Sequence, residues 1–212
     1  FVAYQTAYLK ANYPVEFMCA LLTSESGNME KTALYVEECR RMNIDVLPPD
    51  INHSDTGFTV EDNAIRFGLG AIKNVGEGPT RAIVEEREKN GAFRDIYDFC
   101  ARLDSRMINR RLIESMNKAG AFASTQWNRR QVAEVIEGAL NEGQVAQRER
   151  ASGQISLFDM GDLGNEMILH TKPELLEWPD HELLQHEKDM LGLYVSGHPL
   201  SRHANLLNRY AT

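Results

Sequence analysis

The sequence has 212 residues, of which 42% are hydrophobic and 25% are charged, and its formal net charge is −8. This composition is typical of a globular protein with one sizeable core or two small ones. No apolar run approaches the roughly 18 to 20 residues that a membrane-spanning helix needs, and the first residues lack the zones of a signal peptide. We therefore expect a soluble, cytoplasmic chain with no membrane partner. The three cysteines (Cys19, Cys39 and Cys100) have no CxxC spacing, so we expect reduced, mostly buried thiols and no zinc site.

The charge is distributed unevenly along the chain. Residues 1–64 carry 4 basic and 10 acidic side chains, residues 65–158 carry 15 and 12, and residues 159–190 carry 2 and 9. The net charge argues against a protein that coats nucleic acid by bulk electrostatics, but the middle of the chain has a basic excess. An excess of this size more often reflects ordinary surface variation, so a motif is needed to give it a function.

The N-terminal part of the chain predicts three helices. Tyr4 and Tyr8 share one face of the first helix; they could stack on bases, but the helical spacing favours packing in the core. Pro14 begins a second helix that runs to Leu22. A third helix, about residues 29–42, has a single apolar stripe. The chain opens on Phe1 inside a helical pattern with no capping residue, which suggests a cut within a longer protein.

The following residues predict a short β-hairpin and then mainly helices. Phe58 and Val60 alternate with polar neighbours, Asp62-Asn63 has turn chemistry, and the alternation resumes from Ile65. Further helices are expected at about 71–74, 79–89, 95–103, 107–119, 129–149 and 179–191. Three glycines interrupt the pattern at 150–166, which we interpret as a linker or exposed loop.

A glycine-containing turn between two predicted helices is the first candidate site. Gly76 and Gly78 lack Cβ atoms, so the turn can adopt positive φ and a phosphate can approach the backbone N–H groups that open the next helix. Lys73 and Arg81 place positive charge on either side. This arrangement resembles the helix-hairpin-helix motif of DNA-binding proteins. The candidate DNA-binding residues are Lys73, Val75, Gly76, Gly78, Thr80 and Arg81. The spacing alone equally allows glycines that serve only to turn the chain.

The predicted linker contains the second candidate site, Gln154-Ile155-Ser156-Leu157-Phe158. Adjacent Leu and Phe in a polar segment cannot bury themselves locally, and exposed apolar pairs often dock on another protein. They could also pack back onto their own domain. With Gln at its first position, the pentapeptide resembles the clamp-binding motif of bacterial replication proteins. In that resemblance Gln154 enters a small polar pocket of the sliding clamp, and Leu157 and Phe158 fill an apolar one.

Longer stretches of the chain resemble the family C replicative DNA polymerases, which are the alpha subunits of bacterial DNA polymerase III. The stretches are residues 3–25, 37–52, 58–78, 91–104, 118–122, 152–158 and 187–200. The resemblance implies four parts: the end of the fingers domain (1–50), a β-hairpin plus helix-hairpin-helix region (51–125), a clamp-binding region (126–200) and the start of a connection to a missing OB domain (201–212).

The same resemblance implies a mainly α, non-catalytic fragment of a DNA-directed DNA polymerase. Its expected partners are double-stranded DNA, the sliding clamp and other replisome subunits. Mg²⁺ is implied for the parent polymerase, whose catalytic aspartates lie in a palm domain that this chain lacks, and no cofactor is expected in the fragment itself. A helix-hairpin-helix nuclease or repair scaffold that binds the clamp is the alternative, and a purely structural interaction module is a third possibility.

Other constellations are weaker. His181 and His186 are separated by about 500° of helix rotation, so their rings diverge and a zinc site is improbable. Residues Val46 to Asp50 are Pro-rich and are predicted to run extended, and Asp50 and the nearby Asp55 have no third acid placed close to them. The family's second hairpin is expected near 105–120, where basic residues occur but Gly120 is the only glycine, so the sequence assigns it no phosphate role.

Overall fold

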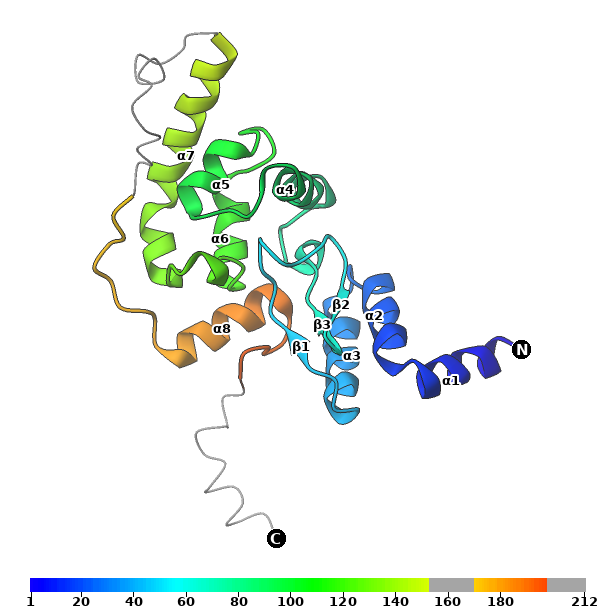
Figure 1. Ribbon diagram of the computed structural model, residues 1–212. Helices are drawn as coiled ribbons and strands as arrows, with labels where there is room; N and C mark the ends of the chain where they lie inside the picture. Colours follow the sequence, from blue (N-terminus) through cyan, green and yellow to red (C-terminus); the bar gives the residue numbers. More distant parts are fainter. Residues whose placement is uncertain (153–169, 198–212) are drawn as a thin grey trace.

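The computed structural model describes residues 1–152 and 170–197, and this part of the chain is mainly helical, as predicted (Figure 1). The α-helices are α1 (Val2–Asn12), α2 (Pro14–Ser24), α3 (Met29–Arg41), α4 (Glu77–Asn90), α5 (Ile96–Arg102), α6 (Arg110–Lys118), α7 (Arg129–Ser152) and α8 (Asp180–Leu191). Two short 3₁₀ helices, η1 (Leu69–Ala71) and η2 (Ala123–Thr125), and three strands, β1 (Val46–Leu47), β2 (Thr59–Glu61) and β3 (Ala64–Arg66), complete the described part.

The predicted β-hairpin is present and belongs to a three-stranded sheet in the order β1-β3-β2. Strands β2 and β3 pair antiparallel, and Asp62 and Asn63 between them both take positive φ, as a tight hairpin turn requires. Val46 lies in a segment that the sequence predicts only as extended. It pairs in parallel with Ile65, so β1 forms the third strand.

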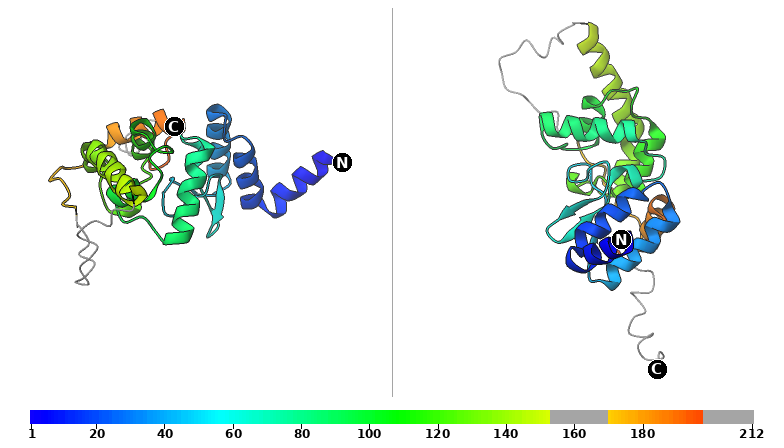
Figure 2. Two further views of the ribbon diagram at one scale, coloured as in Figure 1. Left: turned by 90° about the horizontal axis from the view of Figure 1, so that it is seen from above. Right: turned by 90° about the vertical axis from the view of Figure 1, so that its right-hand side faces the viewer.

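Helix α1 differs from its prediction, because none of its residues is buried in this chain. Tyr4 is 73% exposed and Tyr8 is 50% exposed, and the two rings stack on each other with centroids 6.4 Å apart. Figure 2 shows α1 extending away from the rest of the molecule. The expected core packing of these tyrosines was therefore wrong for this chain. Helix α2, which begins at Pro14 as predicted, buries Met18 and Leu22 instead.

Aromatic rings form the centre of the core beneath α5. The ring of Phe99 lies 5.2 Å from that of Phe93 and 5.2 Å from that of Phe122, measured between centroids, in edge-on geometry. Helix α7 packs closely on α5 because Gly143 has no side chain. A Cβ atom at this position would lie 2.5 Å from the carbonyl oxygen of Cys100.

The three cysteines are buried free thiols, as expected. Burial raises the pKa of the Cys100 thiol to about 12, so this group stays protonated and inert near neutral pH. Within residues 1–152 and 170–197, the helices include none that is long and apolar enough to span a membrane, and no cluster of His, Cys, Asp or Glu could hold a metal ion. Asp50 is instead structural, because its carboxylate accepts the backbone N–H groups of Asn52 and Ser124.

Candidate nucleic-acid interface

The first hairpin is the glycine-containing turn between η1 and α4. The helix expected at 71–74 is absent, because the preceding helical segment is a single 3₁₀ turn that ends at Ala71. The positive φ also lies elsewhere than predicted: Asn74 has φ 66°, whereas Gly76 has φ −89° and Gly78 lies in the first turn of α4. Asparagine tolerates the left-handed region better than most residues, so the turn does not need glycine at that point.

The side chain of Asn74 connects this hairpin to α6. Its amide donates to the Ser115 hydroxyl at 3.0 Å, and its carbonyl oxygen accepts from the Arg111 guanidinium at 2.8 Å. Ser115 is buried, so the contact fixes the turn against the interior of α6. The N-terminal ends of α4 and α6 therefore lie near each other.

A second hairpin links α5 to α6 and lies beside the first. Its turn is held by Asp104, whose backbone oxygen accepts the N–H of Met107 and whose carboxylate accepts the N–H of Arg106. Asn109 then caps α6 by accepting the N–H of Leu112. A Cβ atom added at Gly78 would have the Met107 methyl carbon as its nearest neighbour, at 3.7 Å, which places the two hairpins in contact.

The sequence predicts a second hairpin only broadly, at 105–120, where Gly120 is the only glycine. The signals that mark the observed turn are Asp104 and Asn109, a turn residue and a helix cap. Arg110 and Arg111 open α6, and Lys118 lies in its last turn.

Neither lack of space nor a positive φ requires glycine at positions 76 and 78. A Cβ atom at Gly76 would meet only Pro79, at 3.9 Å, and one at Gly78 only Met107, at 3.7 Å. Both distances are ordinary van der Waals contacts, and neither residue has a positive φ. By contrast, Gly120 has φ +85° and a Cβ there would meet the Arg129 guanidinium at 2.6 Å.

The start of α4 has unpaired backbone donors. No side chain caps this helix, whereas side chains of Asn28, Asp95 and Asn109 cap α3, α5 and α6. The first N–H groups of any helix have no acceptor within the helix itself. Those of α4 therefore face outward beside two exposed glycines.

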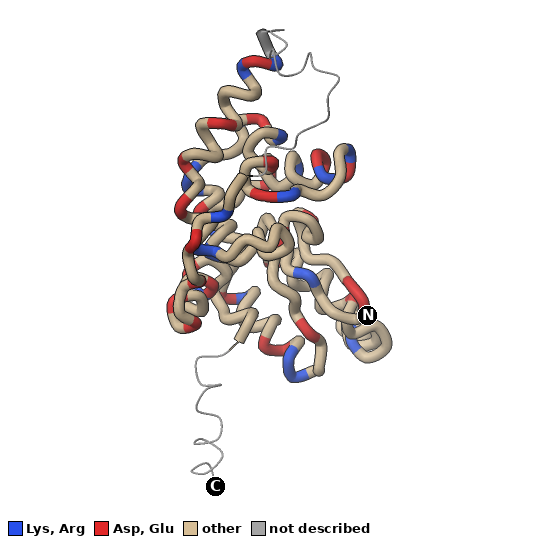
Figure 3. Tube along the Cα trace, turned by 60° about the vertical axis from the view of Figure 1, so that its left-hand side comes forward, with Lys and Arg blue, Asp and Glu red and all other residues tan. Residues whose placement is uncertain are grey.

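The charged residues of the first hairpin are exposed and differ in how they are paired. Lys73 has no ion-pair partner among the residues that the structure describes. Arg81 forms an ion pair of 2.6 Å with Glu77, one helical turn before it. Figure 3 shows basic and acidic residues interspersed along the described chain.

Two of the predicted DNA-binding residues are buried. Val75 is 6% exposed and packs in the core. Thr80 has no exposed surface, and its hydroxyl donates to the backbone oxygen of Glu77 at 2.9 Å. Their side chains shape the turn and are not available to an external phosphate.

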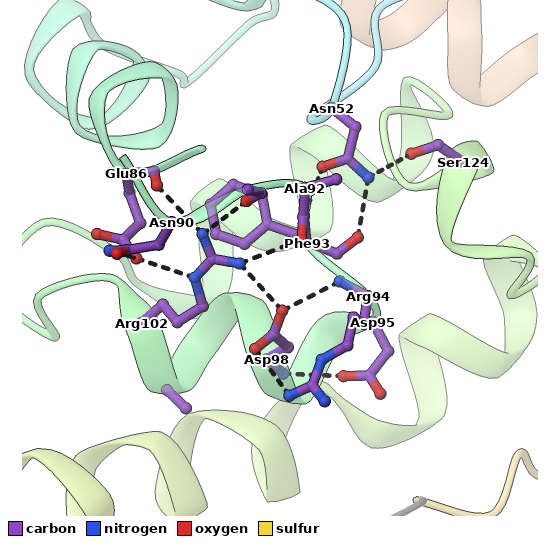
Figure 4. A network of polar contacts seen from close by, with 12 residues as sticks. Asn52, Glu86, Asn90, Ala92, Phe93, Arg94, Asp95, Asp98, Arg102 and Ser124 are labelled. Atoms are coloured by element: carbon purple, nitrogen blue, oxygen red, sulfur yellow. Dashed lines mark hydrogen bonds and ion pairs between the residues drawn. The ribbon is translucent and has the colours of Figure 1, made fainter. Parts of the chain in front are cut away.

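A network around Arg102 holds the arms of the two hairpins together (Figure 4). From α5, its guanidinium donates to the Glu86 carboxylate of α4 at 2.9 Å and to the Asp98 carboxylate at 3.2 Å. It also donates to backbone oxygens of residues 86, 91 and 92, and lies over the Phe93 ring at 4.4 Å from the centroid. Glu86 has a lowered pKa: burial opposes its ionisation, but the hydrogen bonds from Arg102 and Asn90 outweigh burial.

Helix α8 supports the first hairpin from behind. The N–H of Lys73 donates to the backbone oxygen of Met190 at 3.0 Å. The fully buried Glu187 carboxylate in turn accepts from the Arg129 guanidinium of α7 at 2.8 Å and from the Ser196 hydroxyl at 2.7 Å. Burial acts to raise the pKa of Glu187, but these hydrogen bonds outweigh burial and lower it.

The domain boundaries that the sequence predicts near residues 50 and 125 stay a prediction.

The second candidate site, Gln154-Ile155-Ser156-Leu157-Phe158, lies outside the described residues. The described chain ends on one side at Ser152 of α7 and resumes at His170. The His170 ring stacks on Tyr97 of α5 with centroids 3.6 Å apart, and its Nε2 lies 2.8 Å from the Glu142 carboxylate of α7.

The adjoining hairpins, each followed by a helix, define a helix-hairpin-helix module. Comparison with known families agrees, since a family model described as a helix-hairpin-helix motif matches residues 43–132.

Nearly the whole chain is also similar to one segment of bacterial DNA polymerase III alpha subunits, which confirms the resemblance found in the sequence. It is 46% identical over 208 residues to DNA polymerase III subunit alpha of Deinococcus radiodurans, and 40% identical over 212 residues to that of Vibrio cholerae. The subunit from Escherichia coli is 40% identical over 210 residues. The match covers 97 to 100% of this chain but only 15 to 18% of these relatives.

Proposed function

We propose that this chain is the part of a replicative DNA polymerase that holds the backbone of duplex DNA and tethers the enzyme to the sliding clamp. The first hairpin is the principal DNA contact, with the second hairpin beside it. Gln154 to Phe158 form the tether. Nucleotide polymerisation, the catalytic carboxylates and their Mg²⁺ belong to the rest of the polypeptide, and other replisome subunits are further partners.

The observation that carries the DNA-binding proposal is a pair of exposed glycines that neither lack of space nor a positive φ requires. If Gly76 and Gly78 served only to turn the chain, one of them should take a positive φ or have no room for a side chain. Neither does, and both are exposed. A surface that approaches from outside gives the missing reason, because a phosphate can come close to backbone N–H groups only where no Cβ stands in the way.

The chemistry of the site fits a phosphodiester better than a base. The outward N–H groups of α4 donate to phosphate oxygens, and the Lys73 ammonium adds charge beside them. Arg81 must first leave Glu77, so we expect it to contribute less than Lys73. Contacts of this kind fix position on the duplex and carry no sequence information.

The relatives favour a polymerase over a helix-hairpin-helix nuclease or repair scaffold. The three relatives compared above are named as DNA polymerase III subunit alpha, and the similarity extends through both hairpins to the end of the chain. A tether also suits a polymerase that must stay on DNA. Attachment to a clamp makes rebinding intramolecular and can raise the apparent affinity by about 10² to 10⁴-fold.

The hairpin proposal is tested by replacing Gly76 and Gly78 together with alanine. The added methyl groups separate the phosphate from the backbone, so we expect duplex affinity to fall about tenfold, or about 1.4 kcal/mol, whatever the DNA sequence. Folding stability should change little, because alanine is favoured over glycine at position 78 inside α4 but disfavoured at position 76, the N-cap of that helix. Fluorescence anisotropy with labelled duplexes and thermal unfolding measure the two effects.

Gly138→Ala is the matched control. Gly138 is also an exposed helical glycine with room for a Cβ, since its nearest neighbour is the Tyr97 hydroxyl at 3.9 Å, but it lies on α7. DNA affinity should not change in this variant. If the double hairpin variant also binds duplex as tightly as the unmodified chain, the hairpin is a structural turn and the proposal is wrong.

The tether is tested by replacing Leu157 and Phe158 with alanine and measuring capture by a purified bacterial sliding clamp. We expect capture to be lost, because the apolar pair supplies the buried area of the contact. Leu163→Ala, which removes another apolar side chain from the same segment, should leave capture intact. Equal capture of the double variant and the unmodified chain would exclude this pentapeptide as the tether.

A further inference from the structure

An open hollow of about 610 Å³ lies between the second hairpin and the last turns of α7. Its lining is rich in arginine: Arg102, Arg106, Arg148 and Arg150, with Asp104 as the only acid among the described residues that line it. Gln144 and Gln147 contribute amide groups. We refer to it as the arginine hollow.

The walls of the arginine hollow are fixed by polar contacts between α7 and the second hairpin. The Gln147 side-chain oxygen accepts the N–H of Ser105 at 2.9 Å, and its amide donates to the backbone oxygens of Cys100 and Leu103. Arg150 donates to the backbone oxygen of Ala101 at 3.2 Å. The end of α7 is thus bound to the hairpin along one side of the hollow.

The cations of the hollow are not all neutralised by the protein. Arg102 is committed to Glu86 and Asp98, and Arg106 pairs with Asp104 at 2.6 Å. Arg148 has no ion-pair partner among the described residues, and the Arg150 guanidinium donates to a neutral carbonyl oxygen, that of Ala101. Two arginines with unused donors therefore face one concave surface.

The hollow is continuous with the surface of the two hairpins. Ser105 and Arg106 belong to its lining, and the methyl carbon of the next residue, Met107, is the nearest neighbour of a Cβ added at Gly78 of the first hairpin. A duplex seated on the hairpins would present further phosphates along the same surface, because they recur at every nucleotide of its backbone. Planar guanidinium groups match the paired oxygens of a phosphodiester.

We propose that the arginine hollow is an additional binding site for the phosphodiester backbone of duplex DNA, with Arg148 and Arg150 as its main contacts. This inference depends on the proposed DNA binding by the hairpins. It extends the DNA contact along α7 to within four residues of Gln154, the first residue of the proposed clamp tether. DNA and clamp are then held at neighbouring points of one helix and the segment that follows it.

The test is the salt dependence of duplex binding by the full 212-residue chain. Replacing Arg148 and Arg150 with glutamine should reduce the slope of log affinity against log salt concentration by about two, one for each phosphate contact. The corresponding double lysine variant should keep most of the slope because it keeps the charge. Arg130→Gln, at the other end of α7, is the matched control and should leave the slope unchanged.

The outcomes separate this proposal from the one on which it depends. A slope that stays unchanged in the double glutamine variant, while the hairpin glycine variant loses affinity, overturns the arginine hollow alone. Absence of duplex binding by the unmodified chain overturns both. Arg148 forms no hydrogen bond or ion pair with the other described residues, so a slope lowered by about one in Arg148→Gln supports the proposal even if Arg150 proves necessary for folding.

Discussion

The two hairpins lie side by side but satisfy their polar groups in opposite ways. The first begins α4 with a glycine, leaves its N–H groups uncapped and carries Lys73 without an ion-pair partner in the described structure. In the second, Asp104 binds the turn and Asn109 caps α6. Hydrogen bonds from side chains to the backbone N–H groups stabilise a turn, whereas N–H groups without such partners at an exposed glycine turn are suited to bind an external anion.

The arginines show the same difference. In the second hairpin, Arg106 is paired with Asp104, and Arg110 bonds to Glu114 at 2.6 Å and also to Glu137. We interpret the second hairpin mainly as a support that fixes the first one and forms one wall of the arginine hollow.

The largest effect is expected from breaking the connection between the hairpin arms with Arg102→Ala. The change leaves Glu86 and Asp98, which are 20% and 11% exposed at their side chains, without their shared cation. Removing one member of a buried charge network costs about 3–5 kcal/mol, so the free energy of unfolding should fall by roughly that amount. Urea denaturation measures it.

Arg94→Ala is the control for that experiment, because it also removes a cation from Asp98 but its side chain is 58% exposed. We expect less than about 1 kcal/mol of destabilisation. A similar small effect in Arg102→Ala would show that the network of Figure 4 contributes little to holding the hairpins.

A smaller effect is expected when the support behind the first hairpin is weakened through Glu187→Gln. The glutamine can still accept hydrogen bonds, but Arg129 loses its charged partner, which should cost about 2–3 kcal/mol at neutral pH. Because the pKa of Glu187 is lowered in the folded state, its stabilisation is fully present above its ordinary pKa of 4.5 and is lost as the pH falls through the folded value.

Thermal unfolding as a function of pH checks this prediction. The unmodified chain should lose stability as the pH drops below 4.5, and Glu187→Gln should show a flatter profile in that window. Glu182→Gln, on the same helix, should keep the original profile. Identical profiles for the unmodified chain and Glu187→Gln would assign the acid sensitivity to other carboxylates.

Most helices could be predicted because their ends are marked locally. Pro14 begins α2, and Gly91, Gly120 and Gly192 take positive φ just after α4, α6 and α8. The first hairpin was located by Gly76 and Gly78 for the same reason. The geometry of this hairpin was not predicted, because the positive φ belongs to Asn74. The side chain of Asn74 is held by Ser115 and Arg111 of α6, which is far away in the sequence.

The second hairpin and the arginine hollow depend on tertiary contacts that no local pattern reveals. Met107 and Gly78 are 29 positions apart in the sequence, and Ser105 meets Gln147 across 42. For α1 the local pattern predicted burial that the structure does not show. Its tyrosines have the spacing of a buried stripe and yet are exposed in this chain. Periodicity predicts which residues share a face, but not what covers that face.

The smallest effect should separate the two hairpins by charge. Lys73→Gln removes an unpaired cation from the first hairpin, so we expect duplex affinity to fall severalfold and the salt slope to decrease by about one. Arg110→Gln combined with Glu114→Gln removes a paired cation and its partner from the second hairpin, and the net charge is preserved. Anisotropy titrations at several salt concentrations should show no slope change for this second variant. If both variants lower the slope equally, the ion pairs of the second hairpin open on DNA, and the two hairpins contribute alike to phosphate binding.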